Sequence, residues 1–328
     1  LGAGRIIVGS AAFTDRGINE EFLKSLEKAV GRTRVIVAVD SIEGKIAVGG
    51  WRRRLDLEAE SVLPALEPYC SEFLFTCIEK EGTMEGFPAE FGRRLRNSTA
   101  NALTVAGGVG DPEEISALAA IGVNVQLGMA LYTGKISLGE GFINSLDWKK
   151  GLIPTVVQNE EGQVLMLAYS TPDSLRRTFD EGRMCYFSRS RQRLWSKGEE
   201  SGNVQALVRI RADCDADTLL ATVRQTGGAC HTGSYSCFGG RKFTLRQLSD
   251  VVRDRLENPR PGSYTASLDR RMIGEKILEE AGELVEAEEK NHIVWEAADL
   301  MYFTLVRLAE RKIPLGDVMR ELERRRNA

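Results

Sequence analysis

Residues 213–217, DCDAD, interleave three aspartates with one cysteine, and two further cysteines follow shortly afterwards. The surrounding run LVRIRADCDADTLLATVRQ is rich in Val, Leu, Ile and Thr, which predicts an extended strand. Successive side chains of a strand point to opposite faces, so we expect the aspartates on one face and the thiol on the other. Carboxylates suit Mg²⁺ and thiolates suit Zn²⁺. The expected ligands are Asp213, Asp215 and Asp217 for magnesium and Cys214, Cys230 and Cys237 for zinc.

Three protein ligands would leave the fourth zinc position open for a water, which zinc acidifies towards about pH 7. His231 directly follows one expected thiolate, and we predict that it is the general base.

Two known types of metal site do not fit this sequence. A calcium loop counted from Asp213 would need Gly and Glu where Thr218 and Arg224 stand. A zinc deaminase would need H-x-E and P-C-x-x-C motifs, which this sequence lacks. Three buried, inert cysteines remain the alternative to a zinc site.

A second set of acidic residues occurs at helical spacing near the C-terminal end. KILEEAGELVEA carries an E-E-x-x-E pattern, and WEAADLMYFTLVRL places two acids three residues apart in an apolar helix. Acids in such a helix are costly unless they are paired or bind metal. We therefore predict a Mg²⁺ site between two helices that acts on a polyphosphate, with a solvated acidic face as the alternative. Its expected ligands are Glu279, Glu280, Glu283, Glu296 and Asp299, with Glu280 and Glu283 as catalytic candidates.

Three regions with different sequence patterns must position these residues. Residues 1–146 alternate strand-like runs with amphipathic helices, which predicts an α/β region with a parallel sheet. Residues 147–241 are strand-rich with one short helix, which predicts a β-rich α+β domain. Residues 242–328 predict an all-α domain.

Composition narrows the functional classes. The 328 residues carry a net charge of −3, so nucleic acid and membranes are not expected partners. No apolar run approaches the ~20 residues that span a bilayer. Without a secretory signal, we expect the six cysteines to be reduced and the protein to be cytoplasmic.

The middle region resembles phosphoribosyl-AMP cyclohydrolase from GLIPTVVQNEEGQVLMLAYS through YFSRSRQRLWSKGEESGNVQ to GGACHTGSYSCF. The resemblance implies a zinc- and magnesium-dependent homodimer that adds water to C6 of the adenine ring and opens the N1–C6 bond. It also implies that Cys214 of one subunit completes a zinc site with Cys230 and Cys237 of the other. The substrate-binding positions implied are Arg189, Arg191, Lys197, Glu199 and Ser201.

The last region resembles phosphoribosyl-ATP pyrophosphohydrolase through SYTASL and the two acidic helices. The resemblance implies release of pyrophosphate from phosphoribosyl-ATP, and it adds Tyr264, Thr265 and Lys276 as substrate-binding residues. The motif by itself also allows a general nucleotide-triphosphate pyrophosphohydrolase.

The first region resembles the C-terminal part of the histidine-pathway isomerase barrel, notably in GGVGDPEEISALAAIGVNVQLGMALYTGKI. Five predicted strands do not close an eight-stranded barrel, so we expect either further strands upstream or a relic with an open edge. Glu81 stands where the family has a catalytic aspartate, so we do not expect isomerase activity. The vestigial site would comprise Asp40, Thr76, Glu81, Gly108 and Gly128.

Together these patterns predict an enzyme for the second and third steps of histidine biosynthesis. It would use Zn²⁺ and Mg²⁺, act on small nucleotide substrates and form a homodimer. Two alternatives stay open: a scaffold protein with a structural zinc, and a zinc nucleotide deaminase fused to a nucleotide-triphosphate pyrophosphohydrolase.

Overall fold

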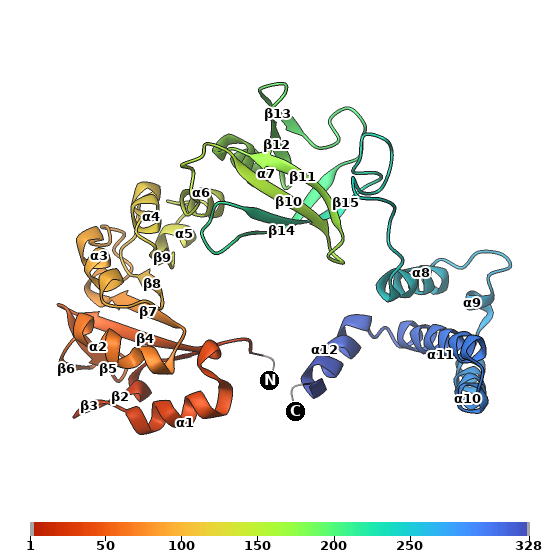
Figure 1. Ribbon diagram of the computed structural model, residues 1–328, viewed down its shortest axis with the longest axis horizontal. Helices are drawn as coiled ribbons and strands as arrows, with labels where there is room; N and C mark the ends of the chain where they lie inside the picture. Colours follow the sequence, from red (N-terminus) through yellow and green to blue (C-terminus); the bar gives the residue numbers. More distant parts are fainter. Residues whose placement is uncertain (1–2, 327–328) are drawn as a thin grey trace. The chain divides into compact units, whose positions relative to one another are not determined.

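The computed structural model describes residues 3–326, which divide into two compact units; the first ends at Gly239 and the second begins at Gly240. Along the chain, an α/β region is followed by a β-rich region and then by helices alone (Figure 1). This order confirms the predicted fold class. The predicted boundaries at residues 146/147 and 241/242 stay predictions.

The α/β region is built on a sheet whose five predicted strands all form and run parallel, although the fifth is short. They are β1 (Ile6–Val8), β4 (Val35–Ile42), β7 (Glu72–Cys77), β8 (Ala102–Ala106) and β9 (Asn124–Val125). Two antiparallel strands, β5 (Lys45–Val48) and β6 (Arg53–Glu58), extend β4, and β2 (Phe13–Thr14) pairs with β3 (Gly17–Ile18). Within residues 3–326 the parallel strands form an open sheet, as expected for part of a barrel.

Helices follow these strands and bury one face of the sheet. They are α1 (Glu20–Val30), α2 (Ala59–Leu66), α3 (Ala89–Asn97), α4 (Pro112–Ala119), α5 (Met129–Tyr132) and α6 (Leu138–Asn144), with short 3₁₀ turns η1 (Ser10–Ala12), η2 (Arg32–Arg34), η3 (Glu67–Tyr69) and η4 (Ile78–Lys80). Alternate strand residues such as Val37, Phe73 and Leu103 are fully buried in the shared core. This period of two is what a strand with one face against helices requires.

The β-rich region has a four-stranded sheet in the order β11-β10-β15-β14. Its strands are β10 (Ile153–Asn159), β11 (Val164–Ser170), β14 (Gln205–Ala212) and β15 (Leu219–Gln225), and a separate hairpin joins β12 (Cys185–Ser188) to β13 (Arg193–Ser196). The single expected helix is α7 (Pro172–Glu181). It begins with a capping box at Thr171 and ends at Gly182, whose left-handed φ of 64° favours glycine.

The prediction that residues 213–217 continue a strand is wrong. β14 ends at Ala212 and β15 begins at Leu219, so DCDAD forms the turn between two antiparallel strands. The Asp213 carboxylate accepts hydrogen bonds from the backbone amides of Asp217 (3.2 Å) and Thr218 (3.1 Å). Aspartate side chains compete in this way for backbone amides and so favour turns over strands.

The second unit contains five helices among its described residues: α8 (Leu245–Glu257), α9 (Tyr264–Ser267), α10 (Arg270–Glu286), α11 (Lys290–Glu310) and α12 (Leu315–Arg326). Asp269 caps the start of α10 by accepting from the Met272 amide at 2.8 Å. Val252, Ile273, Phe303 and Val306 form the core between α8, α10 and α11. None of the helices described in residues 3–326 is long and apolar enough to cross a membrane.

Candidate functional site

The turn between β14 and β15 gathers the three predicted magnesium ligands. Oxygen atoms of Asp213, Asp215 and Asp217 lie within 4.8 Å of one another. Lys150 donates to Asp217 at 2.6 Å, and this hydrogen bond lowers the pKa of the Asp217 carboxyl. The donors are hard oxygens on an exposed turn, so they fit Mg²⁺, which keeps several of its waters.

Two of the predicted zinc ligands lie in a loop after β15. Cys230 and Cys237 line one cavity of about 510 Å³ together with His231. The Thr232 hydroxyl donates to the Cys230 sulfur at 3.2 Å, and this bond lowers the pKa of that thiol. Burial instead raises the pKa of the Cys237 thiol. Both cysteines are free and line the cavity together with the His231 imidazole, and thiolates with imidazole are a donor set that zinc accepts.

Cys214 lies elsewhere in the same chain. It is exposed on the turn between β14 and β15, and it is absent from the described residues that line the Cys230–Cys237 cavity. One chain therefore brings together two of the three predicted thiolates. The shared zinc site stays a prediction.

The predicted substrate-binding residues divide between the cavity and the surface beside it. Arg191, Lys197, Glu199 and Ser201 line the cavity. Lys197 donates to the Ala229 carbonyl at 2.8 Å, and partial burial lowers the pKa of its ammonium group. Arg189 lies outside the lining and stacks on Tyr169, with its guanidinium 3.9 Å from the ring centre.

The reasoning from sequence missed Trp195, which also lines this cavity. Its ring packs on the buried Tyr186, with ring centres 5.3 Å apart. Arg191 and Lys197 each place a charged group 6.0 Å from the centre of the Trp195 ring. Trp195 lies on β13, and the sequence gave no sign of which face of this strand would meet the cavity.

The helical unit gathers a second group of acids. Carboxylate oxygens of Glu280 and Glu283 on α10 and Glu296 on α11 lie within 4.8 Å of one another. Glu280 and Glu296 are each only 7% exposed. Burial raises the pKa of Glu280, and a hydrogen bond shared with Glu296 raises the pKa of Glu283. These raised pKa values mark negative charge held without enough compensation, which a divalent cation would supply.

The other expected members of this site lie at its edge. Lys276 contacts Glu279 at 2.8 Å and Glu280 at 3.6 Å, so it offsets part of the negative charge. Asp299 lies one turn after Glu296 on α11, and its charge contributes to the raised pKa of Glu280. His292, one turn before Glu296, lies 3.0 Å from that carboxylate.

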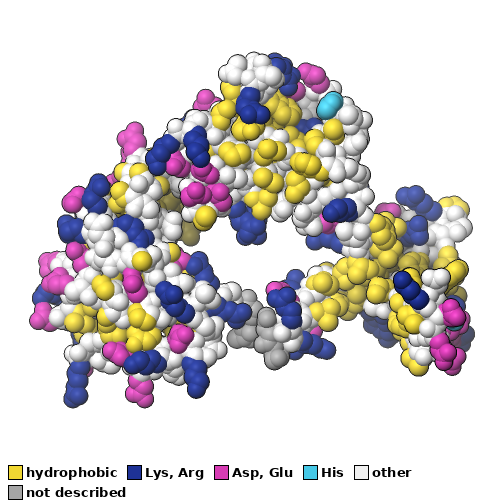
Figure 2. Space-filling model, viewed as in Figure 1, with side chains coloured by type: hydrophobic (Ala, Val, Ile, Leu, Met, Phe, Trp, Pro, Cys, Tyr) yellow, Lys and Arg dark blue, Asp and Glu magenta, His cyan; other side chains and the backbone are white. Residues whose placement is uncertain are grey.

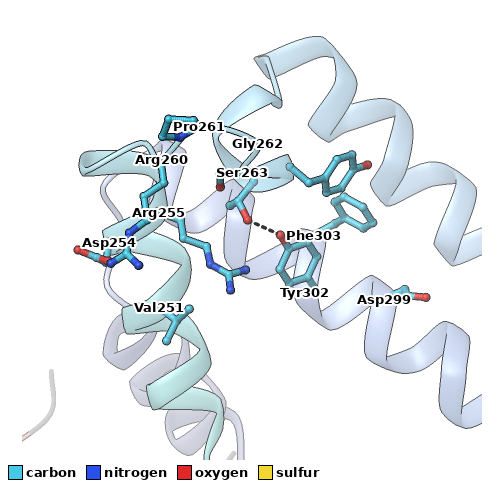
Figure 3. A pocket seen from close by; sticks show the side chains of 12 residues that line it. Val251, Asp254, Arg255, Arg260, Pro261, Gly262, Ser263, Asp299, Tyr302 and Phe303 are labelled. Carbon is cyan, nitrogen blue, oxygen red and sulfur yellow. Dashed lines mark hydrogen bonds and ion pairs between the residues drawn. The ribbon is translucent and has the colours of Figure 1, made fainter.

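A cavity of about 870 Å³ adjoins the acidic group, and Asp299 lines it (Figure 3). The predicted substrate residues Tyr264 and Thr265 belong to its wall. Sequence reasoning missed Arg255, Tyr302 and Phe303, which also line it. Arg255 lies on α8, for which no role was predicted.

The expected vestigial isomerase residues lie at the carboxyl ends of the parallel strands. Asp40 pairs in register with Thr76, and the Asp40 carboxylate accepts from the Trp51 indole at 2.8 Å. Glu81 lines a small pocket with Gly108 and Gly128. A side chain at Gly108, whose φ is 94°, would approach the Gly86 carbonyl to 2.7 Å, so this turn requires glycine.

Comparison with known families assigns each region. Residues 166–239 match the family model for phosphoribosyl-AMP cyclohydrolase, and residues 245–326 match that for phosphoribosyl-ATP pyrophosphohydrolase. Residues 1–137 match the family model named histidine biosynthesis protein.

Individual relatives combine the last two regions. The histidine biosynthesis bifunctional protein HisIE of Pyrococcus furiosus is 43% identical over 206 residues, which is 57% of this chain and 98% of that protein. This chain belongs to the HisIE family. The HisIE protein of Vibrio cholerae is 41% identical over 195 residues, covering 55% of this chain and 93% of its own length. A histidine biosynthesis trifunctional protein of Kluyveromyces lactis is 41% identical over 208 residues, which is 26% of its length. The predicted resemblance to both enzymes is thus confirmed, and the acidic helices and the thiol cavity lie inside the HisIE-like part.

Proposed function

We propose that this chain catalyses two consecutive hydrolyses in histidine biosynthesis. The helical unit releases pyrophosphate from phosphoribosyl-ATP, and the β-rich region opens the adenine ring of the resulting phosphoribosyl-AMP. The observation that carries the proposal is the pairing of each family match with its own cluster of ligand-type residues. The three glutamates lie within residues 245–326, and the thiols and three aspartates lie within residues 166–239.

In the helical unit, Mg²⁺ would be held by Glu280, Glu283 and Glu296, with Glu279 and Asp299 at the edge. When bound, the ion supplies positive charge that neutralises the phosphate oxygens of the substrate. Glu280 and Glu283 are the candidates to take the proton of the attacking water, because both carboxylates belong to the acidic group that would hold the ion. Lys276, which pairs with Glu279 and Glu280, would provide a further cation for the phosphates.

In the β-rich region, zinc would be held by Cys214, Cys230 and Cys237, and Mg²⁺ by the three aspartates of the turn. Zinc, when bound, supplies an acidified water for addition to C6 of the ring. His231, which lines the cavity, would accept the proton of that water, and Arg191 and Lys197, which also line it, would bind a substrate phosphate. One water is consumed and the N1–C6 bond opens, without release of ammonia.

The zinc site would be completed by a second copy of the chain, so the active form is a homodimer. The support is the location of Cys214 on an exposed turn, outside the cavity lined by Cys230 and Cys237. An exposed thiolate ligand on a turn is available to a partner in a way that a buried one is not.

The two activities are expected to be separable by single substitutions. Glu283→Ala should reduce pyrophosphate release from phosphoribosyl-ATP by about a thousandfold or more, because it removes a ligand from the acidic group. Ring opening of supplied phosphoribosyl-AMP should remain within about twofold. Cys230→Ala should show the reverse pattern and lose zinc by metal analysis. Pyrophosphate, ring opening and ammonia are measured separately.

Glu286→Ala is the matched control, since Glu286 is exposed on the same helix and outside the acidic group. Loss of both activities in either single variant would contradict independent sites. Stoichiometric ammonia release from phosphoribosyl-AMP would replace ring opening with deamination.

A further inference from the structure

The cavity beside the acidic group is large enough for more than a triphosphate. Its volume of about 870 Å³ lies in the range of whole-ligand sites. Asp299 lines it, and Asp299 lies one turn after Glu296 of the acidic group on α11. The cavity therefore begins where the metal-held phosphates would end.

A cation without a protein partner lines the other side of this cavity. Arg255 lies in the last turn of α8, and within residues 3–326 it forms no ion pair. Its neighbours differ: Arg253 pairs with Asp250 at 2.6 Å, and Arg260 lies 3.7 Å from Asp254. Figure 3 shows the Arg255 guanidinium extending from α8 towards Tyr302, whereas Asp299 lies one turn nearer the start of α11. An unpaired guanidinium in a cavity wall is suited to bind a phosphate.

Aromatic residues line the cavity between Asp299 at one end and Arg255 at the other. Tyr302 packs edge-on against Phe303, with ring centres 5.2 Å apart. Tyr264 also packs edge-on against Phe303, with ring centres 6.4 Å apart. The Tyr302 hydroxyl is fixed by a 2.7 Å hydrogen bond with Thr265. A wall of this kind suits the flat face of a purine base.

We propose that Arg255 binds the phosphate of the second ribose, the one that phosphoribosyl-ATP carries and ATP lacks. The inference rests on the proposed function of the helical unit and deepens it by naming the group that sets substrate choice. The substrate has one anionic group at each end of its adenine ring. The acidic group with its metal takes the triphosphate, the aromatic wall takes the base, and Arg255 takes the distal phosphate. A nucleoside triphosphate with a single ribose would leave Arg255 unused.

The test is Arg255→Gln in the full-length chain, with Arg253→Gln as the matched control on the same helix. KM for phosphoribosyl-ATP should rise about ten- to a hundredfold, as expected for a lost charge-assisted hydrogen bond, while kcat changes less than about threefold. Magnesium ATP serves as a competing ligand, and its inhibition constant should not change. Thermal unfolding checks whether Arg255 acts only by stabilising the C-terminal end of α8.

Two results would overturn the inference: an unchanged KM, or an ATP inhibition constant that rises as much as KM. The second would place Arg255 at the triphosphate. If the unaltered chain released no pyrophosphate from phosphoribosyl-ATP, the proposed function itself would fail and the inference with it. The three outcomes are distinguishable because the unaltered chain is measured first.

Discussion

Glu296 is a buried acid on a helix that leaves the neighbouring apolar residues Val294 and Trp295 exposed. The carboxylate is only 7% exposed, whereas the adjacent Trp295 is 71% exposed. A carboxylate that stays buried beside two others costs stability unless a cation compensates it. At the residue scale, therefore, we expect the acidic group to lower the stability of the metal-free chain, as the proposed metal site requires.

Glu280→Gln should show this cost directly. Burial raises the pKa of Glu280 above its ordinary value of 4.5, so the folded chain keeps this proton at pH values where the unfolded chain has lost it. The ionised carboxylate thus destabilises the fold above the folded-state pKa, and the cost vanishes below the unfolded value. Without metal, the variant should unfold a few degrees higher than the original chain at about pH 7, with little difference at about pH 4.

Scanning calorimetry with and without Mg²⁺ checks this prediction. Magnesium should raise the unfolding temperature of the original chain and have little effect on the helical unit of the variant. A variant that is less stable than the original chain at neutral pH would show that Glu280 is already compensated by Lys276.

At the scale of elements, the turn between β14 and β15 combines a structural role and the proposed ligand role in one residue. The Asp213 carboxylate holds the turn through two backbone amides, and it also belongs to the group of three aspartates. The turn further requires a left-handed φ of 60° at Ala216. The same side chain that ends the strand therefore places the oxygens together.

Substitutions at Asp213 should separate these roles. Asp213→Asn keeps an oxygen acceptor for the two amides, so the free energy of unfolding should change by less than about 0.5 kcal/mol. Asp213→Ala loses both hydrogen bonds and should cost about 1 kcal/mol. Both should weaken Mg²⁺ binding by a similar factor. Urea unfolding and calorimetric Mg²⁺ titration give the two quantities, and equal stability of the two variants would argue against the turn role.

At the scale of the whole molecule, surface chemistry favours association. Large hydrophobic side chains are exposed in the helical unit, including Leu278, Val285 and Trp295, and Figure 2 shows hydrophobic side chains at the surface over α8 and α11. Exposed apolar patches of this kind are typical of protein–protein contacts.

A mixing experiment tests whether the zinc site is shared between subunits. Cys214→Ala and Cys230→Ala should each abolish ring opening alone. When the two variants are co-expressed, half of the dimers are mixed, and each mixed dimer has one intact site. Activity should therefore return to roughly a quarter of the original value. If each chain built its own zinc site, the mixture would stay inactive; Cys185→Ala, a buried cysteine outside the site, is the control.

Local sequence patterns predicted many of the strands and helices. The strand-like run at Val35–Ile42 and the amphipathic helical stretches depend on neighbours along the chain, so they could be predicted from the sequence. The turn at residues 213–217 could not be predicted in this way, because strand propensity and turn formation compete in this segment. The hydrogen bonds to the Asp213 carboxylate decide in favour of the turn. Arg255 and Trp195 gave no signal because their roles depend on which cavity they face.

The sequence by itself determined the order of the regions, the candidate ligand residues and the two acidic patterns, because these depend on composition and spacing. Only the tertiary structure decided that α10 and α11 bring Glu280, Glu283 and Glu296 together, and that Cys214 lies apart from Cys230 and Cys237. The physical reason is that burial and proximity are properties of packing between elements, which no single segment contains.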